Sequence, residues 1–320
     1  MTELTTAQER EKAGDTDGAL VAYRAAQDKC GALKPPRRAR AACAEALLGE
    51  AEVLEHVQRT DEAIAAYLAI PAKVPDDTAT ASIATLRVGE MLLRAGKTTD
   101  AWTALWKCIT DWPEEASAGD ALRTLVDDGR RRDPRALTEQ LAKILTALSE
   151  TQVADNLLWS LADLSENELA NPTAARGFYD RIPLDHPKSG MRDDARWHGA
   201  RISRAIRDPQ GAVTRLRGLL ATREVAFGAG SYFSIWLDDA QLELGKVLRD
   251  DLGDTRAAIV AFEKLPKDYP ASILRDDALW ELAMTHQRAN DGKACETLAK
   301  LAKQSPESKY LARRQELACE

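Results

Sequence analysis

Apolar residues recur along the chain at positions i, i+4 and i+7, a spacing that places three side chains on one face of an α-helix. Two clear sets are Ala63, Tyr67 and Ile70, and Ala258, Phe262 and Leu265. A proline follows each set by five residues, at Pro75 and Pro270. Because proline lacks an N–H and restricts the residue before it, it ends a helix and begins a turn. The pattern predicts amphipathic helices that end shortly before these prolines.

Sets of this kind recur eight times, and each begins with an alanine. The anchor alanines are Ala19, Ala63, Ala101, Ala136, Ala175, Ala212, Ala258 and Ala294. They lie about 39 residues apart on average, and a helical segment precedes them, as at 86–93 and 242–248. The sets in the fourth and sixth repeats are the weakest matches. The repeating unit is predicted to be a pair of helices, which the small alanine allows to approach closely.

A fixed period of this length is the signature of a solenoid, in which each repeat packs only on its neighbours. Length alone suggests about two domains. The repeat instead predicts an all-α solenoid that forms one domain over residues 1–320. The predicted repeats are 3–35, 36–75, 76–113, 114–150, 151–187, 188–225, 226–270 and 271–306, followed by a capping helix at 307–320.

The anchor sets and their prolines resemble the tetratricopeptide repeat (TPR) family over about residues 3–306. The resemblance implies a right-handed superhelix of about eight helix-turn-helix repeats. It also implies that the first helix of each pair lines a concave groove, where a peptide or protein partner binds. One departure is the length of the repeat, which exceeds the roughly 34 residues usual in this family.

Three repeats end in Pro-x-Ser, at 187–189, 270–272 and 306–308. These endings resemble the repeats of bacterial cell-envelope proteins, such as the Tol-Pal accessory protein and the outer-membrane assembly lipoproteins. A helix stop followed by an N-cap serine explains the same residues without any such relationship. Both interpretations stay open at the level of sequence.

The composition excludes several classes of protein. With 44 Lys and Arg against 51 Asp and Glu, the formal net charge is −7, whereas nucleic-acid binding needs a basic surface. No apolar run approaches the roughly 18 residues of a transmembrane helix, so no transmembrane segment is expected. Residues 1–6 lack the basic start and apolar stretch of a signal peptide, so none is expected in the sequence as written.

Four of the five cysteines fall in two pairs, Cys30 with Cys43 and Cys295 with Cys319. Each pair is placed symmetrically about a predicted turn, and residues equidistant from the turn of an antiparallel helix pair lie side by side. Both pairs are therefore candidate disulfides, which would clamp the first and last repeats and indicate an oxidising compartment. The alternative is that all five cysteines, including Cys108, are buried thiols.

No arrangement of residues points to catalysis. The histidines, His56, His186, His198 and His286, lie far apart in the sequence. No metal-binding, dinucleotide-binding, Walker or nucleophile-elbow motif occurs. Paired acids at 193–194, 238–239 and 276–277 recur at the repeat period, so we interpret them as charges that favour helix starts. We expect no enzyme activity, no cofactor and no metal.

Tryptophans supply candidates for the partner groove. Trp159, Trp197, Trp236 and Trp280 fall one per predicted first helix in the last four repeats. The resemblance places first helices along the groove, so these side chains are candidate partner contacts, together with His198 and Arg201 of the sixth repeat. The alternative is that each tryptophan packs inside its own repeat.

The segment at 227–233 is out of character with the rest of the chain. Phe227, Tyr232 and Phe233 lie beside two glycines in a chain with few aromatic residues. One hypothesis is a loop that docks a partner. The alternative is the start of a longer first helix in the seventh repeat.

The sequence thus predicts an interaction scaffold without catalytic activity, which binds a protein or peptide partner. We expect the periplasm or cell envelope if a leader was removed, and the cytoplasm if Met1 is the native start. The alternatives are a cytoplasmic TPR adaptor or regulator and, more distantly, a helical domain of an enzyme. Neither the partner nor the oligomeric state follows from the sequence.

Overall fold

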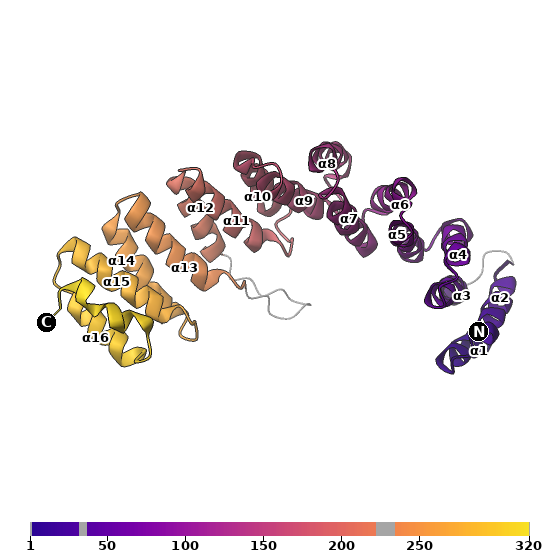
Figure 1. Ribbon diagram of the computed structural model, residues 1–320, viewed down its shortest axis with the longest axis horizontal. Coiled ribbons are helices and arrows are strands. Elements are labelled where there is room, and N and C mark those ends of the chain that lie inside the picture. The colour runs from indigo at the N-terminus through magenta and orange to yellow at the C-terminus, as the bar shows by residue number, and fades with distance from the viewer. Residues whose placement is uncertain (1, 32–36, 222–233, 320) are drawn as a thin grey trace. The chain divides into compact units, whose positions relative to one another are not determined.

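The computed structural model describes residues 2–31, 37–221 and 234–319. Within these parts the chain forms sixteen α-helices joined by short turns, and no strand (Figure 1). The α-helices follow one another in eight consecutive pairs, which confirms the predicted all-α fold of helix-turn-helix repeats. Across the described ranges, every helix is too short or too polar to span a bilayer.

The helix pairs follow the order of the sequence. The first four pairs are α1 (Thr2–Lys12) with α2 (Thr16–Asp28), α3 (Arg37–His56) with α4 (Thr60–Lys73), α5 (Thr78–Arg94) with α6 (Thr98–Asp111), and α7 (Ala116–Gly129) with α8 (Pro134–Leu148). The last four are α9 (Ala154–Asn167) with α10 (Pro172–Asp185), α11 (Arg192–Ala205) with α12 (Pro209–Ala221), α13 (Leu237–Lys246) with α14 (Thr255–Asp268), and α15 (Arg275–Ala289) with α16 (Ala294–Gln304). Three short elements complete the described chain: the 3-10 turn η1 (Lys29–Gly31), the π-helical turn η2 (Val247–Asp251), which extends α13, and the 3-10 helix η3 (Lys309–Leu317). In each pair, the earlier helix is called the first helix and the later one the second helix.

Glycine and aspartate build the turn between the helices of several pairs. Gly14 and Gly253 have φ angles of 77° and 68°, a left-handed conformation that glycine adopts without strain. The next residue, Asp15 or Asp254, is the N-cap of the second helix, and its carboxylate accepts a hydrogen bond from a backbone N–H three residues on. The turn therefore both reverses the chain and starts the second helix.

Seven of the eight anchor alanines are buried, with exposed fractions between 0% and 8%. In the fourth repeat the predicted anchor, Ala136, is wrong by one residue, because Leu137 is the fully buried side chain. Asp133 caps the backbone N–H of Ala136 at the start of α8, so Ala136 lies at the rim of the helix and not at the crossing. Leu137, Leu141 and Leu145 form the buried face of α8.

Glycines in the first helices admit large side chains from the second helices. A Cβ atom at Gly89 of α5 would lie 2.6 Å from Cδ2 of Leu105, which is fully buried in α6. Gly245 of α13 faces the ring of Phe262 in α14 in the same way. A methyl group does not fit at either position, so the helices of these two pairs pack closely at a glycine.

Contacts divide the chain into two compact units, residues 1–160 and 161–320. The first unit has a continuous apolar core that extends from Leu4 to Ala104. The second unit has one core around α12 to α15, which contains Phe262, and another at its C-terminal end, which contains Trp280. The organisation of the whole chain as one domain stays a prediction.

The predicted capping helix is the 3-10 helix η3, which packs against α15 and α16. Leu317 of η3 is 2% exposed and shares a core with Leu301. Two residues after the end of η3, Cys319 is joined to Cys295 of α16 by a disulfide with Cα atoms 5.5 Å apart. In the first unit, a second disulfide joins Cys30 to Cys43 with Cα atoms 5.8 Å apart.

Candidate partner-binding surface

Three first helices, α11, α13 and α15, begin with pairs of aspartates. In α13 and α15 the first aspartate of the pair is hydrogen-bonded to the following repeat. Asp238 of α13 accepts a hydrogen bond from Oγ of Ser272, at 2.6 Å. Asp276 of α15 accepts one from Oγ of Ser308, at 2.8 Å. These serines are the last residues of the Pro-x-Ser segments, and each also accepts a backbone N–H from two residues on. The segment therefore fixes the junction between repeats as well as capping a turn.

In two of the three pairs, the second aspartate accepts hydrogen bonds from residues of the following repeat. Oδ1 of Asp194 accepts the indole N–H of Trp236, at 2.5 Å. Oδ1 of Asp277 accepts the hydroxyl of Tyr310 at 2.6 Å and the ammonium of Lys309 at 3.2 Å. The interpretation of these acids as helix-start charges alone is incomplete, because their carboxylates join consecutive repeats. A signal was present in the sequence, since serine and the aspartate pair recur with the same period.

Aromatic rings stack at the same junctions. Trp197 stacks on Trp236 with ring centroids 5.1 Å apart, and Trp280 stacks on Tyr310 at the same distance. Trp280 is only 3% exposed, so it offers almost no surface to a partner. The four tryptophans are not equivalent as predicted, because Trp236 is the N-cap residue before α13 and not part of a first helix. Stacking between repeats explains why these side chains are half-buried or buried.

The remaining predicted groove residues differ in their surroundings. His198 stacks on the ring of Tyr179 at 5.0 Å, and its Nδ1 lies 3.6 Å from Oε2 of Glu166. Arg201, three residues further along α11, is exposed. Trp159 is half-buried and belongs to the first unit, whereas the other predicted groove residues belong to the second. The structure therefore leaves Arg201 as the most accessible side chain of the predicted set.

The predicted docking loop, with Phe227, Tyr232 and Phe233, lies outside the described residues.

Ion pairs join the C-terminal halves of the first helices in the second unit. Arg204 of α11 binds Glu243 of α13 and Asp251 of η2, both at 2.7 Å. Arg249 of η2 binds Glu281 of α15 at 2.5 Å and Asp250 at 2.8 Å. Hydrogen bonds from the Arg249 guanidinium, and then from Arg288, lower the pKa of Asp250 to about 2. These charges are largely satisfied by one another.

We call the exposed and half-exposed side chains of α11, α13 and α15 the first-helix surface. At its N-terminal end lie the aspartate junctions, and at its C-terminal end lie the ion pairs described above. Asp239 of α13 is half-exposed on this surface. Burial, followed by the neighbouring charge of Asp238, raises the pKa of Asp239 above its ordinary value. This surface can offer a partner hydrogen-bond acceptors, charges of both signs and partly exposed indole rings.

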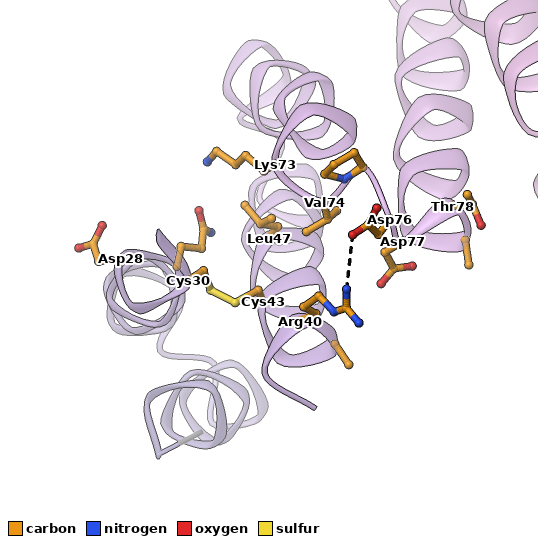
Figure 2. A pocket seen from close by; sticks show the side chains of 14 residues that line it. Asp28, Cys30, Arg40, Cys43, Leu47, Lys73, Val74, Asp76, Asp77 and Thr78 are labelled. Carbon is orange, nitrogen blue, oxygen red and sulfur yellow. Dashed lines mark hydrogen bonds and ion pairs between the residues drawn. A yellow bond between two sulfur atoms is a disulfide. The ribbon is translucent and has the colours of Figure 1, made fainter. Parts of the chain in front are cut away.

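The first unit contains an open pocket of about 820 Å³ among α2, α3 and the turn between α4 and α5 (Figure 2). Leu47, Val74 and the disulfide between Cys30 and Cys43 are among the groups that line it. Arg40 forms an ion pair with Asp76 at one side, at 3.4 Å, but both side chains are at least half exposed and the pair is weak. The pocket thus offers an apolar surface with charges of both signs and no selective set of donors.

In the described ranges, no three His, Cys, Asp or Glu side chains converge on one point. Cys108 is the free cysteine, and burial raises its pKa to about 12, so its thiol stays protonated. A protonated, enclosed thiol is a poor nucleophile and a poor metal ligand.

The tetratricopeptide repeat family model matches two segments of the chain, residues 239–272 and 277–308. These segments coincide with the pairs α13–α14 and α15–α16 and include the second aspartates Asp239 and Asp277. By its fold, the protein is an all-α repeat protein with a TPR-like solenoid. The two matched segments are TPR repeats, and both lie in the second unit.

Several solved structures are similar to the chain at low sequence identity. The MamA protein is 18% identical with a TM-score of 0.43, over 59% of this chain and 92% of that one. YrrB, described as a TPR protein with an unusual peptide-binding site, is 15% identical with a TM-score of 0.43, over 67% and 98%. PilW, described as a widely conserved type IV pilus biogenesis factor, is 15% identical with a TM-score of 0.38, over 84% and 97%. No curated protein matches the chain.

Proposed function

We propose that the protein is a non-catalytic scaffold that binds a peptide or protein partner on the first-helix surface of its second unit. The observation that carries the proposal is the coincidence of the two matched TPR segments with this surface. TPR repeats serve as protein-interaction modules, and their first helices present the side chains that contact partners. The surface here combines the half-exposed carboxylate of Asp239 with exposed cations such as Arg201, which suits a polar peptide.

Site-specific photo-crosslinking tests the proposal in cells. A benzophenone amino acid replaces Arg201 of α11 or Gln287 of α15, both exposed on first helices. Matched controls carry the same amino acid at Thr214 of α12 or Glu263 of α14, exposed on second helices. We expect a discrete protein adduct from the first two positions and not from the controls. Equal adducts from all four positions, or none from any, would contradict the proposed surface.

We further propose that the protein works in a bacterial cell envelope. Two disulfides support this location, because such bonds persist in oxidising compartments and are rare in the cytosol. A cytoplasmic adaptor is the alternative and requires these four cysteines to be reduced in the cell. Trapping thiols with an alkylating reagent in intact cells, followed by mass spectrometry, distinguishes the two. Alkylation of Cys30 and Cys319 in growing cells would overturn the envelope location.

A further inference from the structure

Asp239 differs from the other carboxylates of the first-helix surface. In the described parts of the chain, no other residue forms a hydrogen bond or ion pair with its side chain. Its neighbour Asp238 is held by Ser272, and Glu243 one turn later is held by Arg204. Lys246 lies near enough to oppose the rise in the pKa of Asp239, but forms no ion pair with it. A half-buried carboxylate is therefore left with acceptor capacity at the N-terminal end of the surface.

The chain itself shows which groups the equivalent carboxylates accept. At the next junction, Asp277 accepts the ammonium of Lys309 and the hydroxyl of Tyr310, the two residues that follow Ser308. The ammonium also lies over the Tyr310 ring, 4.9 Å from its centroid. At the preceding junction, Asp194 accepts the indole N–H of Trp236. A second aspartate in this position thus binds an ammonium or an aromatic donor supplied by the following repeat.

At Asp239 the following repeat supplies neither an ammonium nor an aromatic hydrogen-bond donor. The two residues after Ser272 are Ile273 and Leu274, and neither side chain has a polar atom. Leu274 packs on the apolar core of the second unit, whereas Ile273 is 89% exposed. Because Ser272 is hydrogen-bonded to Asp238, this exposed isoleucine follows directly on the residue that fixes the junction. The junction therefore presents a carboxylate together with uncovered apolar surface.

We propose that Asp239 and Ile273 form a binding site for a lysine side chain of the partner. The ammonium would pair with Asp239, and the aliphatic stem would cover Ile273. The partner's lysine then supplies in trans the ammonium that Lys309 supplies in cis at Asp277. The site rests on the proposed function, because it assigns a partner chemistry to the same surface.

A labelled peptide tests the site directly. The probe is fluorescein-Gly-Ser-Lys-Tyr-Leu-Gly-amide, added to the full chain at low ionic strength and followed by fluorescence anisotropy. We expect saturable binding that Asp239→Asn weakens by about tenfold, since a hydrogen bond to a charged group is lost. A probe with glutamate in place of lysine should not bind. Equal binding of the two probes, or equal binding by wild type and Asp239→Asn, would overturn the proposal.

A pair of surface variants provides a control that does not depend on removing a carboxylate. Ile273→Lys places a lysine at the position equivalent to Lys309, which pairs with Asp277, and should abolish binding of the probe. Ile235→Lys makes the same change at the preceding junction, where Trp236 already occupies Asp194, and should leave binding unchanged. Both positions are strongly exposed, at 89% and 74%, so neither change disturbs the core. Loss of binding in both variants, or in neither, would contradict the assignment to Asp239.

The peptide-binding test of the lysine site and the crosslinking test of the proposed function can fail independently. If cells yield adducts at the first-helix surface but Asp239→Asn leaves both adducts and peptide binding unchanged, only the lysine site fails. If the probe binds at Asp239 but no adduct forms at Arg201 or Gln287, the proposed scaffold function fails.

Discussion

The indole Nε1 of Trp236 donates a hydrogen bond to Oδ1 of Asp194, which lies 42 residues earlier in the chain and 2.5 Å away. The same ring stacks on Trp197 of the preceding repeat. One side chain thus contributes both a polar and an apolar contact to the junction between the sixth and seventh repeats. Because a solenoid is held by contacts between neighbouring repeats, such a junction bears directly on stability.

Replacing Trp236 by phenylalanine should destabilise the second unit by about 1.5–3 kcal/mol. The phenyl ring preserves most of the stacking on Trp197 but removes the N–H that Asp194 accepts, and a hydrogen bond to a charged group is worth about that much. Urea unfolding of wild type, Trp236→Phe, Asp194→Asn and the double variant measures the coupling between the two side chains. Additive effects of the two changes would show that the hydrogen bond contributes no stability.

Replacing Gly245 by alanine should destabilise the protein by about 1–3 kcal/mol, although alanine favours helix over glycine. A Cβ atom there would overlap the ring of Phe262, which is fully buried and cannot move aside. Gly177 of α10 is the matched control, because no neighbouring atom lies within 4 Å of its added Cβ. Gly177→Ala should stabilise by about 0.5–1 kcal/mol. Thermal unfolding compares the two, and a stabilised Gly245→Ala would contradict the packing described for this pair.

The thiol count reports the state of the cysteines. In denaturant without reductant, Ellman's reagent should detect one thiol, that of Cys108. The native protein should react slowly, because Cys108 is fully buried and burial raises its pKa to about 12. Five reactive thiols in denaturant would exclude both disulfides.

Replacing Cys295 and Cys319 together by serine should lower the free energy of unfolding of the C-terminal repeat by about 3 kcal/mol, because the disulfide restricts the unfolded chain. Hydrogen exchange over α16 and η3 measures this loss of protection.

The charge network around Asp250 predicts a loss of stability in acid. Its pKa is lowered from 3.8 to about 2 by hydrogen bonds from Arg249 and Arg288. A carboxyl group with a depressed folded-state pKa stabilises the protein above its unfolded-state pKa, and this contribution is lost as the pH falls from about 4 to about 2. Because Asp250 is partly exposed, we expect about 1 kcal/mol. Urea unfolding at several pH values should show a weaker dependence in Asp250→Asn, and an unchanged dependence would contradict this account.

The repeat pattern was sufficient to predict the eight helix pairs, because buried alanines and large apolar residues recur on one face of each second helix. It failed locally at Ala136, where an aspartate cap shifts the helix start and moves the buried face to Leu137. It also grouped Trp236 with the first-helix tryptophans, because similar spacing cannot distinguish a residue before a helix from one inside it. The junctions escaped prediction for another reason: Ser272 and Asp238 are 34 residues apart, and their contact depends on how consecutive repeats stack.

The two residues after each junction serine, Ser272 or Ser308, affect how binding can evolve by substitution. Lys309 and Tyr310 donate hydrogen bonds to Asp277, whereas Ile273 and Leu274 have no polar side-chain atom to donate to Asp239. Substitutions confined to these turn positions would switch an acceptor between occupied and available without altering any helix. Binding preference could therefore be inherited, lost or exchanged repeat by repeat, while the helical framework stays the same.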